Sequence, residues 1–126
     1  MRKNVKFYKC PICANVIGLI DGDPEHLSCC GKSMKQLDPN TADAAQEKHV
    51  PICKVEGDKL VVTVGDVVHP MEEDHYIMWI AQVTDNQTTR VRLNPGDLPR
   101  VEFQALGECV IYAYCNKHGL WKADIE

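Results

Sequence analysis

Seven cysteines stand out in this chain of 126 residues, and four of them fall in one short segment. Cys10 and Cys13 are two residues apart, and the adjacent pair Cys29-Cys30 follows further along. A C-x-x-C pair can chelate one ion from a tight knuckle, and a second pair of thiolates completes a tetrahedron. Because the second pair is adjacent here, we expect skewed sulfur–metal–sulfur angles. Zinc and iron both tolerate this, so spacing leaves both open; disulfides are the weaker alternative.

A second set of candidate ligands lies at strand ends and in loops. It comprises His49, His69, His75, Cys115 and His118. Cys115 and His118 flank a tight turn, so their thiolate and imidazole can reach the same ion. Any one of these histidines alone is more simply interpreted as an ordinary surface or core residue. Four of the chain's five histidines at loop edges, beside a Cys-x-x-His, favour one shared metal site.

Five such donors would specify an unusual centre. Four imidazoles and one thiolate exceed the four ligands of structural zinc, and the donor types suit iron, copper or nickel. With the imidazoles in a plane and the sulfur axial, the position opposite the sulfur would stay open. A ferrous ion there would keep a net charge of about +1, which beside Lys48 suits a small anion.

The elements that must position these residues divide into two segments. Residues 1–37 carry the first four cysteines but few large apolar side chains, so we expect a metal to stabilise this unit. Residues 38–41 have the composition of a linker, and Thr41 is a candidate cap for a helical turn over 42–45. Alternating apolar residues and frequent turn residues then predict seven short strands, at 50–56, 59–64, 75–84, 88–93, 100–106, 109–115 and about 120–124. This pattern is typical of an immunoglobulin-like antiparallel β-sandwich.

Composition argues against several kinds of partner. The formal net charge is −4 and no stretch clusters Lys and Arg, so nucleic acid and anionic membranes are poor candidates. No apolar run reaches the roughly 18 residues of a membrane span. Cysteines in odd number without an export signal favour free thiols and a cytoplasmic protein.

Three blocks of the sequence resemble the desulfoferrodoxin class of superoxide reductases. They are residues 47–51 (EKHVP), 69–77 (HPMEEDHYI) and 114–121 (YCNKHGLW), in that order along the chain. Three separated blocks in the right order are specific, and the resemblance spans nearly the whole chain. The four N-terminal cysteines match the desulforedoxin-like module that single-centre members lack.

The resemblance implies two iron ions per chain, one in a desulforedoxin-like domain (residues 1–37) and one in a catalytic sandwich domain (residues 38–126). A rubredoxin-like iron would be held by Cys10, Cys13, Cys29 and Cys30. The catalytic iron would have four equatorial imidazoles and one axial thiolate, from His49, His69, His75, His118 and Cys115. Glu47 matches a carboxylate that can take the sixth position when the iron is oxidised, and Lys48 a lysine near the open position. The implied activity reduces superoxide to hydrogen peroxide in a cytoplasmic homodimer, with electrons from rubredoxin or a similar donor.

Two other functions stay open from the residues alone. One is an electron-transfer protein whose two iron centres only carry electrons, and the other is a zinc-stabilised binding module. Cys53 and Cys109 lie within predicted strands and are interpreted as small core residues. Trp79 and Trp121 are interpreted as core or site-shielding residues, and His26 as an exposed loop residue.

Overall fold

The computed structural model describes residues 5–41, 46–65 and 69–126, without the side chains of Gln46 and Glu47. β-structure dominates these ranges, which confirms the mostly-β prediction. None of the helices within them has the length and hydropathy that crossing a membrane requires.

The N-terminal unit consists of short strands and little core. Three strands form an antiparallel sheet in the order β2-β1-β5, and two more form a separate hairpin, β3-β4. The elements are β1 (Lys6–Lys9), β2 (Val16–Leu19), the 3₁₀ turn η1 (Pro24–His26), β3 (Ser28–Cys29), β4 (Lys32–Ser33) and β5 (Lys35–Gln36). In this unit, Phe7, Tyr8 and Cys10 are the buried residues among those described. The scarcity of core agrees with the expectation that a metal stabilises the segment.

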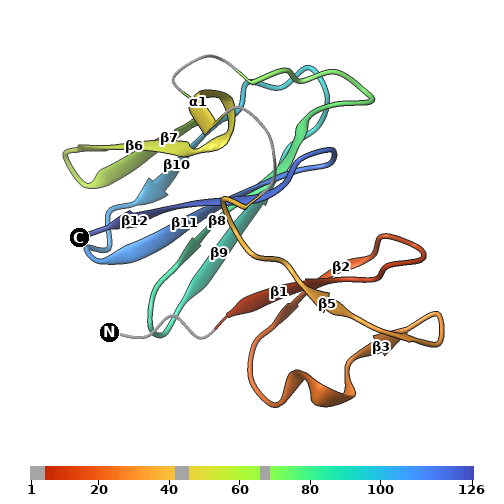
Figure 1. The fold of residues 1–126 in the computed structure, drawn as a ribbon. Helices are drawn as coiled ribbons and strands as arrows, with labels where there is room; N and C mark the ends of the chain where they lie inside the picture. Colours follow the sequence, from red (N-terminus) through yellow and green to blue (C-terminus); the bar gives the residue numbers. More distant parts are fainter. Residues whose placement is uncertain (1–4, 42–45, 66–68) are drawn as a thin grey trace.

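Seven further strands form two antiparallel sheets that face each other (Figure 1). One sheet has the order β10-β7-β6 and the other β12-β11-β8-β9. The elements are α1 (Gln46–His49), β6 (Pro51–Glu56), β7 (Lys59–Val64), β8 (Ile77–Val83), β9 (Thr88–Arg92), β10 (Arg100–Gln104), β11 (Cys109–Cys115) and β12 (Gly119–Ile125). All seven predicted strands are present, and the predicted immunoglobulin-like sandwich is confirmed.

Burial along the strands explains how the two sheets pack. In β10, Val101 and Phe103 face the core while their neighbours face solvent, as their alternation predicts. By contrast, β8 and β11 are buried along nearly their whole length. A strand buried on both faces needs cover on both, and the second cover here is the N-terminal unit.

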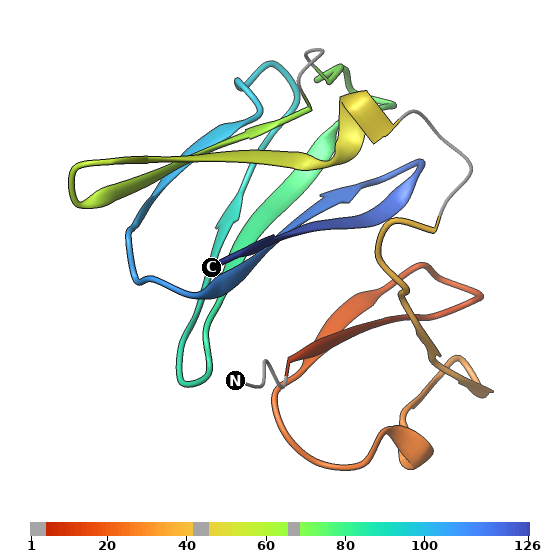
Figure 2. The same ribbon diagram turned by 60° about the vertical axis from the view of Figure 1, so that its left-hand side comes forward.

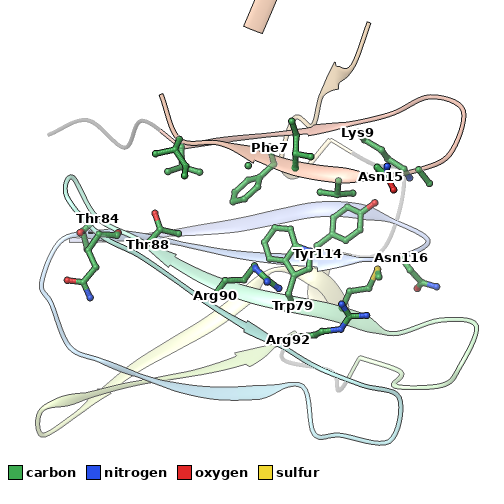
Figure 3. Close-up of a pocket in the computed structure, with 18 of the residues that line it drawn as sticks. Phe7, Lys9, Asn15, Trp79, Thr84, Thr88, Arg90, Arg92, Tyr114 and Asn116 are labelled. Atoms are coloured by element: carbon green, nitrogen blue, oxygen red, sulfur yellow. Dashed lines mark hydrogen bonds between the residues drawn. The ribbon is translucent and has the colours of Figure 1, made fainter. Parts of the chain in front are cut away.

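The N-terminal unit lies against the outer face of the four-stranded sheet (Figure 2), and aromatic rings join the two. The ring of Phe7 lies 4.9 Å from that of Trp79 and 5.1 Å from that of Tyr112, and Trp79 stacks on Tyr114 at 5.6 Å. Beside these rings a cleft of about 1140 Å³ opens between β1 and the sheet (Figure 3). The two parts of the chain are therefore in direct contact.

The start of one strand differs from the expectation, and one expected helical turn cannot be compared. The strand expected over 75–84 begins at Ile77, so His75 lies in the preceding loop. The helical turn expected over 42–45 lies outside the described residues. A short helix, α1, was not expected, and it ends at His49, directly before β6.

Candidate metal centres

Four thiols gather in the N-terminal unit, and we call them the four-thiol cluster. It consists of Cys10, Cys13, Cys29 and Cys30, whose sulfur atoms all lie within 4.8 Å of one another. The knuckle at Cys10 closes through two backbone bonds, from Ala14 N–H to the Cys10 carbonyl (3.2 Å) and from Cys10 N–H to the Asn15 carbonyl (2.9 Å). Ala14 has a positive φ of 65°, which such a tight reversal requires.

The adjacent pair joins the cluster through a hairpin turn. Cys30 and Gly31 connect β3 to β4, with positive φ angles of 54° and 73°. Two consecutive residues with positive φ are typical of a type I′ hairpin turn. This backbone explains how neighbouring cysteines replace the more usual C-x-x-C, and a non-glycine residue at Cys30 carries some strain there.

The electrostatics of the four-thiol cluster favour a cation. The backbone N–H groups of Cys13 and Ile12 donate to the Cys10 sulfur (3.4 and 3.3 Å) and help to lower its pKa to about 6. The neighbouring thiols Cys13 and Cys10 raise the pKa of Cys29 to about 12. The first thiolate therefore opposes ionisation of the rest, and a bound cation removes that opposition. Zinc and iron both fit this donor set.

Five donors from distant parts of the chain meet at one end of the sandwich, and we call them the His/Cys cluster. They are His49, His69, His75, Cys115 and His118. His49 ends α1, His69 and His75 bracket the loop before β8, and Cys115 ends β11. Donor atoms of these four all lie within 4.8 Å of one another. His118 adjoins them, with its Nδ1 3.1 Å from His49 Nε2 and 4.0 Å from Cys115 Sγ.

The four imidazoles form a closed four-cornered ring. Successive ring centroids are 4.6 Å (His49–His69), 4.8 Å (His69–His75), 5.0 Å (His75–His118) and 4.9 Å (His118–His49) apart, each pair nearly perpendicular. The diagonal from His49 to His75 is longer, at 6.4 Å. Imidazole nitrogens bind a transition metal at about 2.1 Å, so two nitrogens at right angles about the ion lie about 3 Å apart. The distance from His49 Nε2 to His118 Nδ1, 3.1 Å, matches this value.

Two buried nitrogens support metal binding directly. The Nε2 atoms of His69 and His75 have no hydrogen-bond partner in the described ranges. His69 Nδ1 lies 2.7 Å from the Pro70 carbonyl, so this nitrogen carries the proton and Nε2 holds the lone pair. Burial lowers the pKa of His69 to about 4, which keeps the ring neutral at physiological pH. The cluster thus has the lone pairs that a metal needs.

A three-residue loop presents the thiol. Cys115 pairs with Gly119 across the β11–β12 hairpin, and Gly119 has a positive φ of 81°. The pairing of β11 with β8 shifts between Tyr114 and Cys115, an irregularity of the kind that re-aims a side chain. Burial raises the pKa of Cys115, while the backbone N–H groups of His118 and Lys117 oppose that shift. These two donors favour a thiolate when a cation is present.

The exposure of the cluster is uneven. His49, His69 and Cys115 are buried, whereas His75 and His118 are only half-buried. Solvent therefore approaches the donors from the side of the last two residues.

Charged neighbours were predicted at Glu47 and Lys48. Lys48 is exposed and directly precedes His49 on α1. The side chain of Glu47 lies outside the described residues. Lys117, to which sequence reasoning gave no role, is also exposed, and its charge acts with burial and His118 to lower the pKa of His75.

Two more residues contact the cluster: Trp121, which was interpreted as a core or site-shielding residue, and Asn116, to which the sequence analysis gave no role. Trp121 stacks on His49, and its indole N–H donates to the His118 carbonyl (3.1 Å). Asn116 bonds to the residues on both sides of His75. Both lie in the YCNKHGLW block, and for Asn116 this proximity in sequence was the one signal that could have pointed to it.

The remaining predicted positions have ordinary surroundings. Cys109 is buried in the sandwich core and Cys53 packs against the same core, which confirms their interpretation as core residues. His26 is exposed on η1, and Trp79 is buried beneath Phe7.

Known proteins match this chain closely. A family described as Desulfoferrodoxin matches residues 41–124. A desulfoferrodoxin homolog of Archaeoglobus fulgidus is 44% identical over 124 residues, and the desulfoferrodoxin of Syntrophotalea carbinolica is 42% identical over 125 residues; both alignments cover 98% of this chain and 99% of the relative. The crystal structure of the superoxide reductase from Treponema pallidum is similar at a TM-score of 0.77 and 28% identity, covering 96% of this chain and 99% of that one. These two relatives and that structure therefore span the four-thiol cluster as well as the sandwich.

Proposed function

The chain belongs to the desulfoferrodoxin family, and from this premise we propose that it is a superoxide reductase acting at an iron ion in the His/Cys cluster. The observation that carries the proposal is the ring of four imidazoles beside a buried thiol, with two buried nitrogens that lack partners among the described residues. The likeness of this chain to the superoxide reductase of Treponema pallidum, over nearly the whole of both chains, supports the same activity.

The reaction needs one electron and two protons for each superoxide, and yields one hydrogen peroxide without dioxygen. Iron held by the His/Cys cluster would supply that electron. The side chains of the cluster have the task of holding the ion while leaving one face accessible. The half-buried side, at His75 and His118, is where a small anion can arrive from solvent.

We assign the ligands and their neighbours as follows. His49, His69, His75 and His118 would hold the iron through their imidazoles, and Cys115 would hold it through its thiolate. Lys48 attracts superoxide through its positive charge, which matters in a chain of net charge −4. Glu47 would be a further ligand when the iron is oxidised.

The four-thiol cluster holds the second iron in this proposal, so that each chain has two centres. Residues 1–37 then form a desulforedoxin-like domain, and residues 38–126 form the catalytic domain. The exposed sulfurs of Cys13 and Cys30 suit exchange of electrons with a protein donor of the rubredoxin type. We further propose a cytoplasmic homodimer; free thiols in a cluster are stable in a reducing compartment.

Stoichiometry with superoxide tests the activity. Iron-loaded, fully reduced protein is mixed with a limiting pulse of superoxide, and hydrogen peroxide and dioxygen are both measured. Reduction gives one peroxide per superoxide and no dioxygen, whereas dismutation gives half as much peroxide. A zinc-loaded sample, which has no redox chemistry, is the control. If the iron-loaded protein removes superoxide no faster than the zinc-loaded sample, the protein is not a superoxide reductase, and the electron-carrier function is favoured.

A further inference from the structure

Asn116 connects the two loops that carry the His/Cys cluster. It directly follows Cys115, and its side chain reaches across to the loop of His75. Its Oδ1 accepts the backbone N–H of Tyr76 (2.9 Å), and its Nδ2 donates to the carbonyl of Asp74 (3.1 Å). Its own backbone N–H donates to the Tyr76 carbonyl (3.2 Å). Three hydrogen bonds thus bind the residues on both sides of His75.

The other donors are oriented by more direct contacts. His69 Nδ1 is bonded to the Pro70 carbonyl, and the ring of His49 stacks on Trp121 at 4.9 Å. The ring of His75 contacts those of His69 and His118, which belong to the same cluster, and its Nε2, like that of His69, has no hydrogen-bond partner in the described part of the chain. The position of its ring therefore depends strongly on where its backbone is held.

We propose that Asn116 is a positioning residue that fixes His75 relative to Cys115 and His118, and so sets how tightly this corner holds iron. The inference rests on the proposed metal site, but not on its reaction with superoxide. Because Asn116 lies next to Cys115 in the loop that ends at His118, its bonds hold this loop in a fixed position relative to the loop of His75. Ligand geometry held in this way reduces the freedom lost when the metal binds.

The chemistry of the side chain explains why this position needs an amide. One group must accept from an N–H and donate to a carbonyl at the same time, over a short reach. An aspartate keeps the acceptor but turns an oxygen toward the Asp74 carbonyl, and an alanine loses both bonds. Figure 3 shows Asn116 at the edge of the cleft, away from Phe7 and Arg90.

A matched control exists elsewhere in the fold. Asn40 bonds to Lys122 in the same pattern, accepting its N–H (2.8 Å) and donating to its carbonyl (3.3 Å), and its own N–H donates to the Leu120 carbonyl (3.0 Å). These bonds go to β12 and not to a donor of the His/Cys cluster. Because Asn40 has a positive φ of 63°, alanine there loses the same side-chain bonds and adds backbone strain. Asn40→Ala therefore removes the same pattern of bonds from an exposed position, and denaturant unfolding of both variants compares the stability that each one loses.

The experiment measures iron release from the full iron-loaded chain to a strong chelator, separately at each centre by its visible absorption. We expect Asn116→Ala to lose iron from the His/Cys cluster about 10- to 100-fold faster than the unaltered protein. The four-thiol centre in the same sample and the Asn40→Ala variant should keep their normal rates. The electron paramagnetic resonance of the ferric His/Cys centre should also broaden in Asn116→Ala alone.

Three outcomes decide the matter. Asn116→Asp keeps the Tyr76 bond, so an iron-release rate between those of the unaltered protein and Asn116→Ala supports the proposal. If Asn116→Ala does not fold, Asn116→Asp takes its place in the comparison. Equal release from Asn116→Ala and Asn40→Ala overturns it, because the effect is then general destabilisation. Normal release from both Asn116 variants overturns it as well. Superoxide assays on the unaltered protein test the enzymatic activity independently.

Discussion

The indole of Trp121 lies on the imidazole of His49, with ring centroids 4.9 Å apart and planes inclined by 24°. Trp121 is fully buried, and its N–H donates to the carbonyl of His118. The Trp121 side chain therefore contacts two neighbouring histidines, His49 and His118, of the four-cornered arrangement of imidazoles. It is a packing residue of the sandwich and a support of the metal site at once.

Trp121→Phe should separate these two roles. The smaller ring can still stack on His49 but loses the bond to His118, so we expect about 1–3 kcal/mol less stability and an altered ferric spectrum. Trp79→Phe is the control, because Trp79 is also buried but stacks on Tyr114 on the outer face of the sheet. Denaturant unfolding and electron paramagnetic resonance measure both effects. Identical spectra for the two variants would contradict the role of Trp121 as a support of the metal site.

Much of the fold could be predicted from sequence because the sandwich is built from local signals. Alternation such as that of Val101 and Phe103 gives the face of a strand, and turn residues give its ends. The contact of Phe7 with Trp79 could not be predicted, since it joins two units that each have their own pattern. The same holds for α1, which is too short to have a periodicity.

The donors of the candidate site were predicted from residue type and family resemblance, and the structure brings them together. Their role as ligands stays a prediction. What holds them was predicted only in part: Trp121 was interpreted as a core or site-shielding residue, but the hydrogen bonds of Asn116 and Trp121 to backbone groups of other residues were not predicted. Such contacts depend on where two loops meet in space, and neither residue type signals them.

Lys48→Ala should slow the bimolecular reaction with superoxide about 2- to 10-fold at low ionic strength and flatten its salt dependence. Lys117→Ala should act in the same direction, because the Lys117 charge already contributes to the lowered pKa of His75. Lys54→Ala is the control; this exposed lysine lies on β6 beside Glu56. Stopped-flow rates over a range of salt concentrations make the test. An unchanged salt slope in both site variants would leave the steering role without support.

Cys115→Ser should remove the sulfur-to-iron absorption of the catalytic centre while that of the four-thiol centre persists. Cys13→Ser should have the reverse effect, because its sulfur lies 3.6 Å from Cys29 Sγ within the other cluster. Visible spectra with iron analysis distinguish the two. If the catalytic band survives in Cys115→Ser, the sulfur ligand of this centre is a different residue.

The metal-free protein should lose stability as the pH falls from about 6.5 to about 4, the range over which His69 binds a proton when unfolded but not when folded. Above that range His69 is neutral in both the folded and the unfolded chain, and below it His69 is protonated in both. The loss in the free energy of unfolding is then complete, at about 3 kcal/mol. Between pH 7 and pH 5 the loss from His69 should be about 2 kcal/mol. Burial lowers the pKa of His75 too, which adds in the same direction.

Urea unfolding of the metal-free chain, followed by the fluorescence of Trp79 and Trp121, measures this loss. His69→Gln removes the titrating ring but keeps a side-chain N–H that can donate, so its stability should fall less between pH 7 and pH 5. The difference between the two proteins isolates His69 from the other histidines and from the carboxylates, most of which titrate at lower pH. An equal fall in both would mean that the His69 ring already takes up its proton in the folded chain near pH 6.5. In that case the buried lone pair on Nε2 would not be preformed for a metal.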